Sequence, residues 1–580
     1  MYMHNHFLFR LRAWFAQGNR TTWSVFLIFF LFLLIKTAIF HYAAFAYIHR
    51  WAARIAPVLM LSSLILFTKN KYWTIIVNIL CDCWLISNLI YYKANGIFFS
   101  FDMIFMLNNM SGFWSSIFAY ISWEVFAFPF LTLLYIILVS ILSLWKTTQR
   151  RLYFIGALLC IISIGIMLQN NRRINRSYQC DTSDWTTYYV FNKQLVWENT
   201  GNLYVRSQSI ISWLPAMLTF QLIQHFDKKQ KQLTQQDQDI ISTLLHGNES
   251  FFCPTQNLIV ILVESFESWS LLPIGDFIFT PYLTRLIQSE HVAYANSVHS
   301  QIKYGVSADG QMLAITGLLP IDAGATCRLY GNNYFRTFVS SYPISSIVNP
   351  SRGTWEQSTM TQSYHFQQLV EPKHDASWND ADVMAHLLDW CMEQDTTFCA
   401  LGITITSHVP FFYGNEHVVN SVPEMPSLMS AYLNCLHYTD SCIGVFVDSV
   451  MATSLANNTS IIITGDHTIF NTNTAFEDMN NYAIKNKIPF HAGHNFVPLI
   501  IYSPEIEGNI QVTDTCYQMD IFPTILHLIG AEDYYWHGFG VNLLDSAARN
   551  NRPCTEQEAY RLSDLIIRSD YFRSMESKTE

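Results

Sequence analysis

Long runs of apolar residues fill most of the first 170 positions and constrain the fold more than any other feature of this sequence. A helix needs roughly 20 apolar residues to cross a bilayer. Five segments approach or reach that length, at about 22–46, 53–68, 72–92, 124–145 and 151–169, and the second and fifth are short. The pattern predicts about five transmembrane helices within residues 1–170. The first segment is long and lacks a cleavage site, so we expect a retained anchor rather than a removed signal peptide.

The charged residues divide the chain into two unlike parts. Residues 1–176 hold 15 Lys and Arg against 3 Asp and Glu, whereas residues 177–580 hold 19 against 41. Basic clusters precede the first apolar segment, separate the second from the third, and separate the fourth from the fifth. In a five-span arrangement these clusters share one side of the membrane, which the positive-inside rule makes cytoplasmic. We therefore expect the C-terminal part to lie outside the cytoplasm.

Composition also excludes several classes of function. Acidic residues are almost absent from the apolar segments, and Asp82 is the notable one. Because charged residues inside a membrane mark ion or substrate pathways, their scarcity favours an anchor over a channel or transporter. The acidic C-terminal part has no basic patch, which argues against nucleic acid binding. None of the 12 cysteines forms a close pair with zinc-like spacing. One or two disulfides fit an exported domain, but the sequence does not pair them.

After residue 250 the pattern changes to short, continuous apolar runs, each followed by polar residues. The runs are NLIVILVES (257–265), FCALGITITSH (398–408), SIIITGDH (460–467) and VPLIIYSP (497–504), separated by helix-like stretches. This alternation predicts an α/β domain over 251–580 with a central, mostly parallel sheet covered on both faces. Residues 171–250 are expected to be a connector, in which ISWLPAMLTFQLIQHF is amphipathic at helical spacing and suits the membrane surface.

Polar side chains stand where several of these predicted strands end, namely Glu264, His408, Asp466 and His467. Ligands of open α/β sheets bind beyond the carboxyl ends of the strands, so we expect these four residues to share a site. Each of them alone fits a structural role. Two carboxylates and one imidazole from this group, joined by one hydroxyl, would make a mixed oxygen and nitrogen ligand set suited to Mn²⁺, Mg²⁺ or Zn²⁺.

Ser307 raises a separate question. It lies in YGVSADGQMLAITGLLP (304–320), just before an apolar run that looks helical. Its hydroxyl could cap that helix, a role for which Asp309 competes. It could also be a nucleophile at a helix N-terminus, where negative charge is stabilised. A divalent metal held by the neighbouring ligand set would activate such a hydroxyl.

Six stretches, taken in order, resemble the alkaline phosphatase–sulfatase superfamily: VESFES, GVSADGQ, TSHVPF, GDH, VPLIIYSP and QMDIFPTILHLIG. More closely, the chain is similar to the membrane-anchored phosphoglycerol transferases typified by lipoteichoic acid synthase, and the likeness covers nearly the whole chain. The resemblance implies an α-helical five-span membrane anchor followed by an alkaline-phosphatase/sulfatase-like α/β domain. It also implies a place in the cytoplasmic (inner) membrane of a bacterium, with the catalytic domain extracytoplasmic.

The resemblance further implies a reaction. A phospholipid head group of the phosphoglycerol type would be transferred through a covalent phospho-enzyme to a hydroxyl of a cell-envelope glycan or lipid. Ser307 would be the nucleophile, in the position where the synthases use threonine. Glu264, Ser307, Asp466 and His467 would be the ligands of the metal, with Mn²⁺ expected before Mg²⁺ or Zn²⁺. His408 would bind the phosphate or assist the leaving group.

The residues that would hold the head group depart from the family. Trp355 matches a tryptophan of the synthases, but Gln357 stands where they have an arginine, and their histidine has no clear counterpart. Losing a bidentate arginine changes the charge of the pocket, so the head group need not be phosphoglycerol. His491 and His494 in HAGHN are further candidates for contact with substrate, and a solvated loop explains them nearly as well.

Three alternatives therefore remain. A phosphoethanolamine transferase shares the anchor and the metal site, and the altered pocket leaves it open. A sulfatase-family hydrolase of phosphodiesters or sulfuric esters shares the fold. Formylglycine maturation, however, needs Pro or Ala two positions after the nucleophile and Arg four positions after it, where this chain has Asp309 and Gln311. A catalytically silent membrane scaffold would have lost the nucleophile or a ligand, and all four positions are filled here.

Overall fold

The computed structural model describes residues 18–45, 50–68, 72–95, 98, 121–142, 144, 152–177, 202–227, 233–243, 245, 254–303, 305–321, 325–352, 356–373, 378–409, 411–419, 422–469, 477–490 and 495–573. The chain forms two compact units. One is helical and comprises residues 1–101 and 117–226. The other is an α/β unit that comprises residues 102–116 and 227–580.

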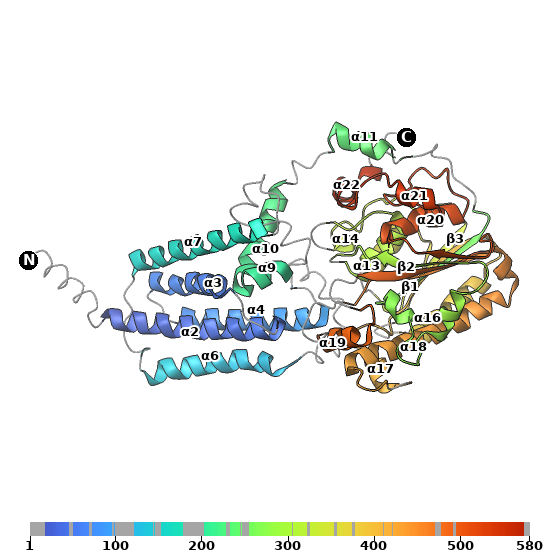
Figure 1. Ribbon diagram of the computed structural model, residues 1–580. Coiled ribbons are helices and arrows are strands. Elements are labelled where there is room, and N and C mark those ends of the chain that lie inside the picture. Colours follow the sequence, from blue (N-terminus) through green and yellow to red (C-terminus); the bar gives the residue numbers. More distant parts are fainter. Residues whose placement is uncertain are drawn as a thin grey trace, which may run out of the picture. The chain divides into compact units, whose positions relative to one another are not determined.

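Apolar helices build the first unit (Figure 1): α2 (Gly18–Phe45), α3 (Trp51–Ser63), α4 (Trp73–Asn95), α6 (Trp123–Ile141) and α7 (Tyr153–Ser177). Four contain stretches long and apolar enough to cross a membrane, namely Thr21–Phe45, Trp73–Lys93, Trp123–Ile141 and Tyr153–Ile174. The prediction of five spans differs at the second segment. There α3 continues only through the 3₁₀ turn η1 (Leu64–Phe67), because polar residues flank the apolar stretch on both sides.

The acidic residue noted within the apolar segments, Asp82, is paired. Lys36 Nζ of α2 lies 2.5 Å from Asp82 Oδ1 of α4 and also donates to Asn78 Oδ1, at 3.0 Å, and to Thr132 Oγ1 of α6, at 2.5 Å. The Lys36 side chain is fully buried. A buried charge is tolerated when it is paired and hydrogen-bonded. The cluster therefore ties three helices together, which supports an anchor more than a transport pathway.

Two helices after the last predicted span, α9 (Asn202–Ser207) and α10 (Ile210–Asp227), belong to the same unit. Arg54 of α3 donates to the backbone carbonyls of Arg206 and Gln208 at the junction of these helices. Trp84 of α4 donates to the carbonyl of Ile210 at 3.0 Å. One face of the amphipathic stretch, including Trp213, is buried. Helix α10 thus uses its apolar face to pack within the helical unit.

A nine-stranded sheet organises the α/β unit. Its order is β4-β3-β5-β1-β6-β7-β2-β8, and β9 pairs with β2. Only β7 runs antiparallel to its neighbours, so the mostly parallel sheet predicted from the sequence is confirmed. The strands are β1 (Asn257–Val263), β2 (Val292–His299), β3 (Ile344–Val348), β4 (Gln368–Val370), β5 (Phe398–Ile403), β6 (Thr459–Gly465), β7 (Phe496–Tyr502), β8 (Asn509–Val512) and β9 (Cys516–Tyr517).

Helices cover both faces of this sheet (Figure 1). Strand β1 is buried along its whole length, as expected for a central parallel strand. Its side chains alternate between two apolar cores: Leu258, Val260 and Leu262 join one, and Ile259, Ile261 and Val263 join the other. The first core includes side chains of α13 (Ser307–Thr316), α20 (Ile521–Leu528) and α22 (Glu556–Ser569). The second includes α12 (Pro281–Leu286), α16 (Asp380–Met392) and α18 (Ser427–Met451).

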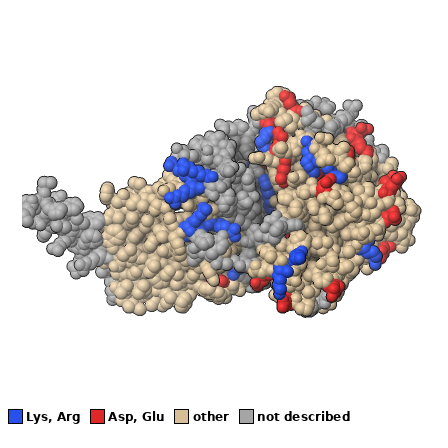
Figure 2. All heavy atoms as spheres, in the orientation of Figure 1, with Lys and Arg blue, Asp and Glu red and all other residues tan. Residues whose placement is uncertain are grey.

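The remaining helices of the unit are short: α11 (Gln235–Thr243), α14 (Thr326–Leu329), α15 (Gln357–Ser363), α17 (Phe412–Glu416), α19 (Glu477–Asn486) and α21 (Ser546–Asn550). Acidic and basic side chains are interspersed over this unit in Figure 2. The first unit shows a broad uncharged surface on the same face, with basic side chains gathered toward one end of it. The cysteines in the described ranges are free thiols, and most are buried.

Candidate active site

The loops that follow three neighbouring strands carry four of the predicted site residues. Glu264 directly follows β1, and Asp466 and His467 directly follow β6. These strands are adjacent and parallel, with Val263 opposite Gly465, so the polar residues that follow them emerge side by side. His408 lies five residues after the end of β5, the other neighbour of β1. The structure thus brings these residues to the carboxyl edge of the sheet, where open α/β sheets bind their ligands.

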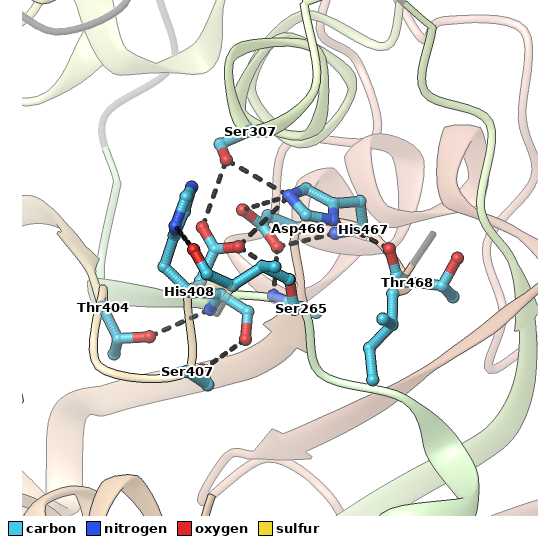
Figure 3. A network of polar contacts seen from close by, with 12 residues as sticks. Ser265, Ser307, Thr404, Ser407, His408, Asp466, His467 and Thr468 are labelled. Carbon is cyan, nitrogen blue, oxygen red and sulfur yellow. Dashed lines mark hydrogen bonds and ion pairs between the residues drawn. The ribbon is translucent and has the colours of Figure 1, made fainter. Parts of the chain in front are cut away.

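Ser307 completes this cluster (Figure 3). Its Oγ lies 3.3 Å from Glu264 Oε2 and 3.4 Å from His467 Nε2. His467 Nε2 in turn lies 3.4 Å from Glu264 Oε1 and 3.5 Å from Asp466 Oδ2. All four side chains belong to buried residues. One hydroxyl, two carboxylates and one imidazole therefore converge in a small volume that is largely closed to water.

The question of whether Ser307 caps its helix has a clear structural answer. Ser307 is the first residue of α13, and the capping position belongs to Val306, which makes no side-chain cap. The competing residue, Asp309, holds the preceding turn instead, because its Oδ2 accepts the N–H groups of Lys303 and Gly305 at 2.8 and 2.9 Å. The Ser307 hydroxyl is thus directed at the acidic cluster, at the positive end of a helix.

The backbone of the turn before Ser307 is strained, as is common at active sites. Val306 has φ 48°, in a region that β-branched residues rarely adopt. Gly310, one turn into α13, packs closely against the loop after β6. A Cβ at this position would lie 2.6 Å from the carbonyl oxygen of Asp466. The close approach brings Ser307 to the ligand set, and a larger residue at 310 would prevent it.

Burial perturbs the acid–base equilibria of the cluster. It raises the pKa of Asp466 to about 7, and the negative charge of Glu264 adds to this effect. Burial also opposes ionisation of Glu264, but the charges of His467 and His408 and hydrogen bonds from Ser265 and Ser307 outweigh it and lower the pKa. For His467, burial lowers the pKa, whereas the charges of Asp466 and Glu264 outweigh burial and raise it. The buried cluster thus favours added positive charge.

A divalent metal would satisfy this need. Glu264, Asp466 and His467 each offer one ligand atom, and these atoms lie within 4.8 Å of one another. Asp466 Oδ2 is buried and has no hydrogen-bond partner in the described part of the chain. Buried carboxylate oxygens are normally hydrogen-bonded or bound to a cation. Two carboxylates and an imidazole suit Mn²⁺, Mg²⁺ or Zn²⁺, so the residues present fit a divalent metal.

Of the residues predicted to contact substrate, the structure describes His408 and Gln357. His408 is half-buried, and its Nδ1 lies 2.6 Å from the carbonyl of Val409. Figure 3 places its ring beside the cluster. Gln357 is buried at the start of α15, and its amide exchanges two hydrogen bonds, of 3.1 and 3.2 Å, with that of Gln311 in α13. Trp355, His491 and His494 lie outside the described residues.

Sequence reasoning missed the residues that hold the carboxylates in place. Ser265 contacts both Glu264 and Asp466. Thr404 Oγ1 accepts the backbone N–H of Glu264 at 2.9 Å, and Ser407 Oγ donates to its carbonyl at 2.6 Å (Figure 3). Small hydroxyl residues beside strand ends were visible in VESFES and ITITSH. The sequence carries no signal for which backbone atoms they reach.

Comparisons with known proteins agree with this architecture. A family model described as sulfatase matches residues 256–531, and a model of the lipoteichoic acid synthase N-terminal domain matches residues 8–203. The lipoteichoic acid synthase-like protein YvgJ of Bacillus subtilis is 22% identical over 520 residues, which cover 82% of this chain and 78% of that protein. Lipoteichoic acid synthase of Staphylococcus saprophyticus is 21% identical over 549 residues, with coverages of 89% and 80%.

Among solved structures, the lipoteichoic acid synthase LtaP from Listeria monocytogenes matches with a TM-score of 0.45 and 18% identity, covering 53% of this chain and 81% of that one. The two family models together confirm the resemblance inferred from the six sequence stretches. They also match its order, an N-terminal membrane part followed by a sulfatase-type domain. The chain is therefore a lipoteichoic acid synthase-like enzyme of the alkaline phosphatase–sulfatase superfamily.

Proposed function

We propose that the protein is a metal-dependent phosphotransferase that moves a phospho-alcohol group, of the phosphoglycerol type, from a membrane phospholipid to a hydroxyl of an envelope glycan or lipid. The observation that carries the proposal is the position of the Ser307 hydroxyl. It lies 3.3 Å from Glu264 and 3.4 Å from His467, within a buried set of oxygen and nitrogen ligands. Relatives named lipoteichoic acid synthase support the same class of reaction.

The reaction would proceed in two balanced steps. In the first, the Ser307 oxygen bonds to phosphorus, the bond between phosphorus and the diacylglycerol oxygen breaks, and that oxygen takes up a proton. In the second, an acceptor hydroxyl bonds to phosphorus, loses its proton, and the Ser307 oxygen leaves and is reprotonated. Glu264 Oε2 and His467 Nε2 lie next to the hydroxyl but would be engaged as metal ligands, so the proton of the Ser307 hydroxyl would pass to solvent before the phospholipid binds. His408 would bind the phosphate or protonate the leaving oxygen.

Glu264, Ser307, Asp466 and His467 would hold the metal, for which we expect Mn²⁺. When bound, a divalent metal supplies positive charge that favours an ionised serine hydroxyl and stabilises a developing oxyanion. The N-terminus of α13 would add to this stabilisation, because its amide groups favour negative charge at Ser307. The Val306–Ser307 turn would keep the hydroxyl oriented between turnovers.

Residues outside the metal-ligand cluster would determine which head group binds. Gln357 is uncharged, buried and engaged with Gln311, so it offers no cation to a phosphate. This feature keeps phosphoethanolamine as the second candidate head group. Trp355, His408, His491 and His494 are the further residues that we propose for substrate contact.

The arrangement in the membrane is also proposed. We assign residues 1–170 to a transmembrane domain, 171–250 to a connector and 251–580 to an extracytoplasmic catalytic domain. Four apolar helices alone would return the chain to the side on which it started, which would separate the basic clusters. Helix α3 with η1 is close to the shortest length that crosses a bilayer. Its crossing as a fifth helix would place all three basic clusters in the cytoplasm.

Mass spectrometry of peptides from the treated full-length protein would test the reaction. Purified protein would be incubated with Mn²⁺ and either phosphatidylglycerol or phosphatidylethanolamine, and the Ser307 peptide would be examined for an adduct. We expect an adduct whose mass identifies the head group, none in Ser307→Ala, and recovery in Ser307→Thr, which keeps one hydroxyl. The absence of an adduct with either lipid, in protein shown to bind Mn²⁺, would contradict lipid-derived transfer and favour hydrolysis or a scaffold.

A further inference from the structure

One residue contacts both carboxylates of the cluster. The backbone N–H of Ser265 donates to Asp466 Oδ1 at 2.9 Å, and its hydroxyl donates to Glu264 Oε1 at 2.7 Å. Figure 3 shows Ser265 beneath the cluster, on the side away from Ser307. Ser265 is 1% exposed, so water does not compete for either bond. A single buried residue thus engages one oxygen of each carboxylate.

The second oxygen of each carboxylate points elsewhere. Glu264 Oε2 lies 3.3 Å from Ser307 Oγ. Asp466 Oδ2 lies 3.5 Å from His467 Nε2 and is buried without a hydrogen bond in the described ranges. Of the two oxygens that Ser265 leaves available, Glu264 Oε2 thus lies beside the proposed nucleophile and Asp466 Oδ2 beside the imidazole, which Glu264 Oε1 also approaches at 3.4 Å. Hydrogen bonds to the non-ligating atoms of a metal site commonly fix the orientation of its ligands.

The backbone of Ser265 is strained to make these contacts. Its φ of 52° is unusual for a residue other than glycine and costs on the order of 1–3 kcal/mol. Tyr432 of α18 holds the strained turn, because its fully buried hydroxyl donates to the Ser265 carbonyl at 2.8 Å and accepts the N–H of Glu267 at 3.2 Å. A turn that served only to connect β1 to the next segment would not need a serine in this conformation.

We propose that Ser265 is a positioning residue that selects which oxygen of Glu264 and of Asp466 is offered to the metal, and so sets the affinity of the site. The role rests on the metal site in the proposed function. It does not depend on which lipid or acceptor the enzyme uses. Ser265 would act through the two carboxylates, without touching substrate.

Titration of the full-length, detergent-purified protein with Mn²⁺, followed by electron paramagnetic resonance of the free ion, would measure this role directly. Ser265→Ala removes the hydroxyl and keeps the backbone N–H. Loss of a partner of this kind weakens metal binding about 10- to 100-fold, and we expect about tenfold here. Ser265→Gly removes the hydroxyl but relieves the strained φ. The glycine variant should bind Mn²⁺ as weakly as the alanine variant, and its melting temperature should be at least as high as that of the alanine variant.

Ser270→Ala is the matched control. Ser270 is also fully buried, and its hydroxyl donates to a backbone carbonyl, that of Glu267, at 2.6 Å. It contacts neither carboxylate of the cluster among its described hydrogen bonds. We expect its Mn²⁺ affinity to stay within about twofold of the wild type. Tyr432→Phe provides a second route, because it releases the Ser265 turn without altering any metal ligand. It should weaken Mn²⁺ binding in the same direction.

The outcomes separate this role from the proposed function. If the wild type binds Mn²⁺ and both Ser265 variants bind it equally well, the role of Ser265 is overturned and the metal site stands. If the wild type does not bind Mn²⁺, the proposed metal site is refuted, and the role of Ser265 is refuted with it. In the adduct assay, the Ser265 variants should need about tenfold more Mn²⁺ for half-maximal rate and approach the wild-type rate at saturation. A rate that stays low at saturating Mn²⁺ would instead indicate general disruption.

Discussion

Metal binding by this protein should depend on pH, because the buried carboxyl of Asp466 must lose its proton to become a ligand. Burial and the neighbouring charge of Glu264 raise the pKa of Asp466 to about 7. Such a group is about nine-tenths ionised at pH 8 and about one-tenth ionised at pH 6. Mn²⁺ should therefore bind roughly tenfold more weakly at pH 6 than at pH 8, a difference of about 1.4 kcal/mol.

The sign of this effect is fixed by the direction of the shift. A raised pKa means that the metal-free folded protein retains a proton that Mn²⁺ must displace, so affinity rises with pH and levels off above about pH 7. The raised pKa of His467, which burial opposes and the carboxylate charges outweigh, acts in the same direction. The tenfold difference in Mn²⁺ affinity, which counts Asp466 alone, is therefore a lower bound. Proton release on metal binding should be detectable in weakly buffered solution.

Isothermal titration of the metal-stripped, full-length protein from pH 5.5 to 8.5 would measure the effect. Asp440→Asn is the control variant. Burial raises the pKa of Asp440 to about 6, but this residue accepts the N–H groups of Tyr282 and Leu283 at the start of α12 rather than facing the cluster. Its replacement should leave the profile unchanged. A dissociation constant that varies less than twofold between pH 6 and pH 8 would refute the reasoning.

Three further predictions concern packing and buried charge. Asp520 is buried and bound by both Nη atoms of Arg552, at 2.6 and 2.8 Å, so Arg552→Met should destabilise the α/β unit by about 3–5 kcal/mol; thermal unfolding would show little change if the pair contributes nothing. Gly310→Ala should lower both Mn²⁺ affinity and adduct formation, because its Cβ would lie 2.6 Å from a backbone oxygen of the loop after β6; unchanged Mn²⁺ binding would contradict that contact. Lys36→Met should destabilise the detergent-solubilised protein by about 3–5 kcal/mol by leaving a buried carboxylate, and adding Asp82→Asn should restore most of the melting temperature; equal melting of the single and double variants would refute the pairing.

The positions of the acidic cluster could be predicted because two simple patterns coincide. Buried parallel strands are continuously apolar, and the first polar residues after them mark their carboxyl ends. Glu264 and Asp466 are such residues, and adjacency of β1 and β6 brings them together. The direction of β7 could not be predicted, since VPLIIYSP is equally apolar in either orientation.

What the sequence did not reveal are contacts made by backbone atoms and by residues far apart in the chain. The positive φ of Ser265 arises from a turn fixed by Tyr432, 167 residues away. Arg54 could not be read as a partner of carbonyls more than 150 residues later, and no periodicity encodes such a contact. Helix α3 and η1 together span Trp51–Phe67, close to the predicted 53–68, but the 3₁₀ end could not be predicted. Hydropathy marks an apolar stretch but not where regular helix gives way to a 3₁₀ turn.

The pairing of Lys36 with Asp82 imposes an order on biosynthesis. Lys36 precedes Asp82 by 46 residues and Thr132 by 96 residues, so α2 leaves the ribosome well before either partner exists. A lone lysine at the centre of an inserted helix costs about 2.5–3.5 kcal/mol, which the strongly apolar remainder of α2 can offset. Insertion of α4 and then α6 removes that cost. A nascent bundle without its later helices would therefore keep an unneutralised ammonium, and the full set of Lys36 partners exists only once α4 and α6 are in place.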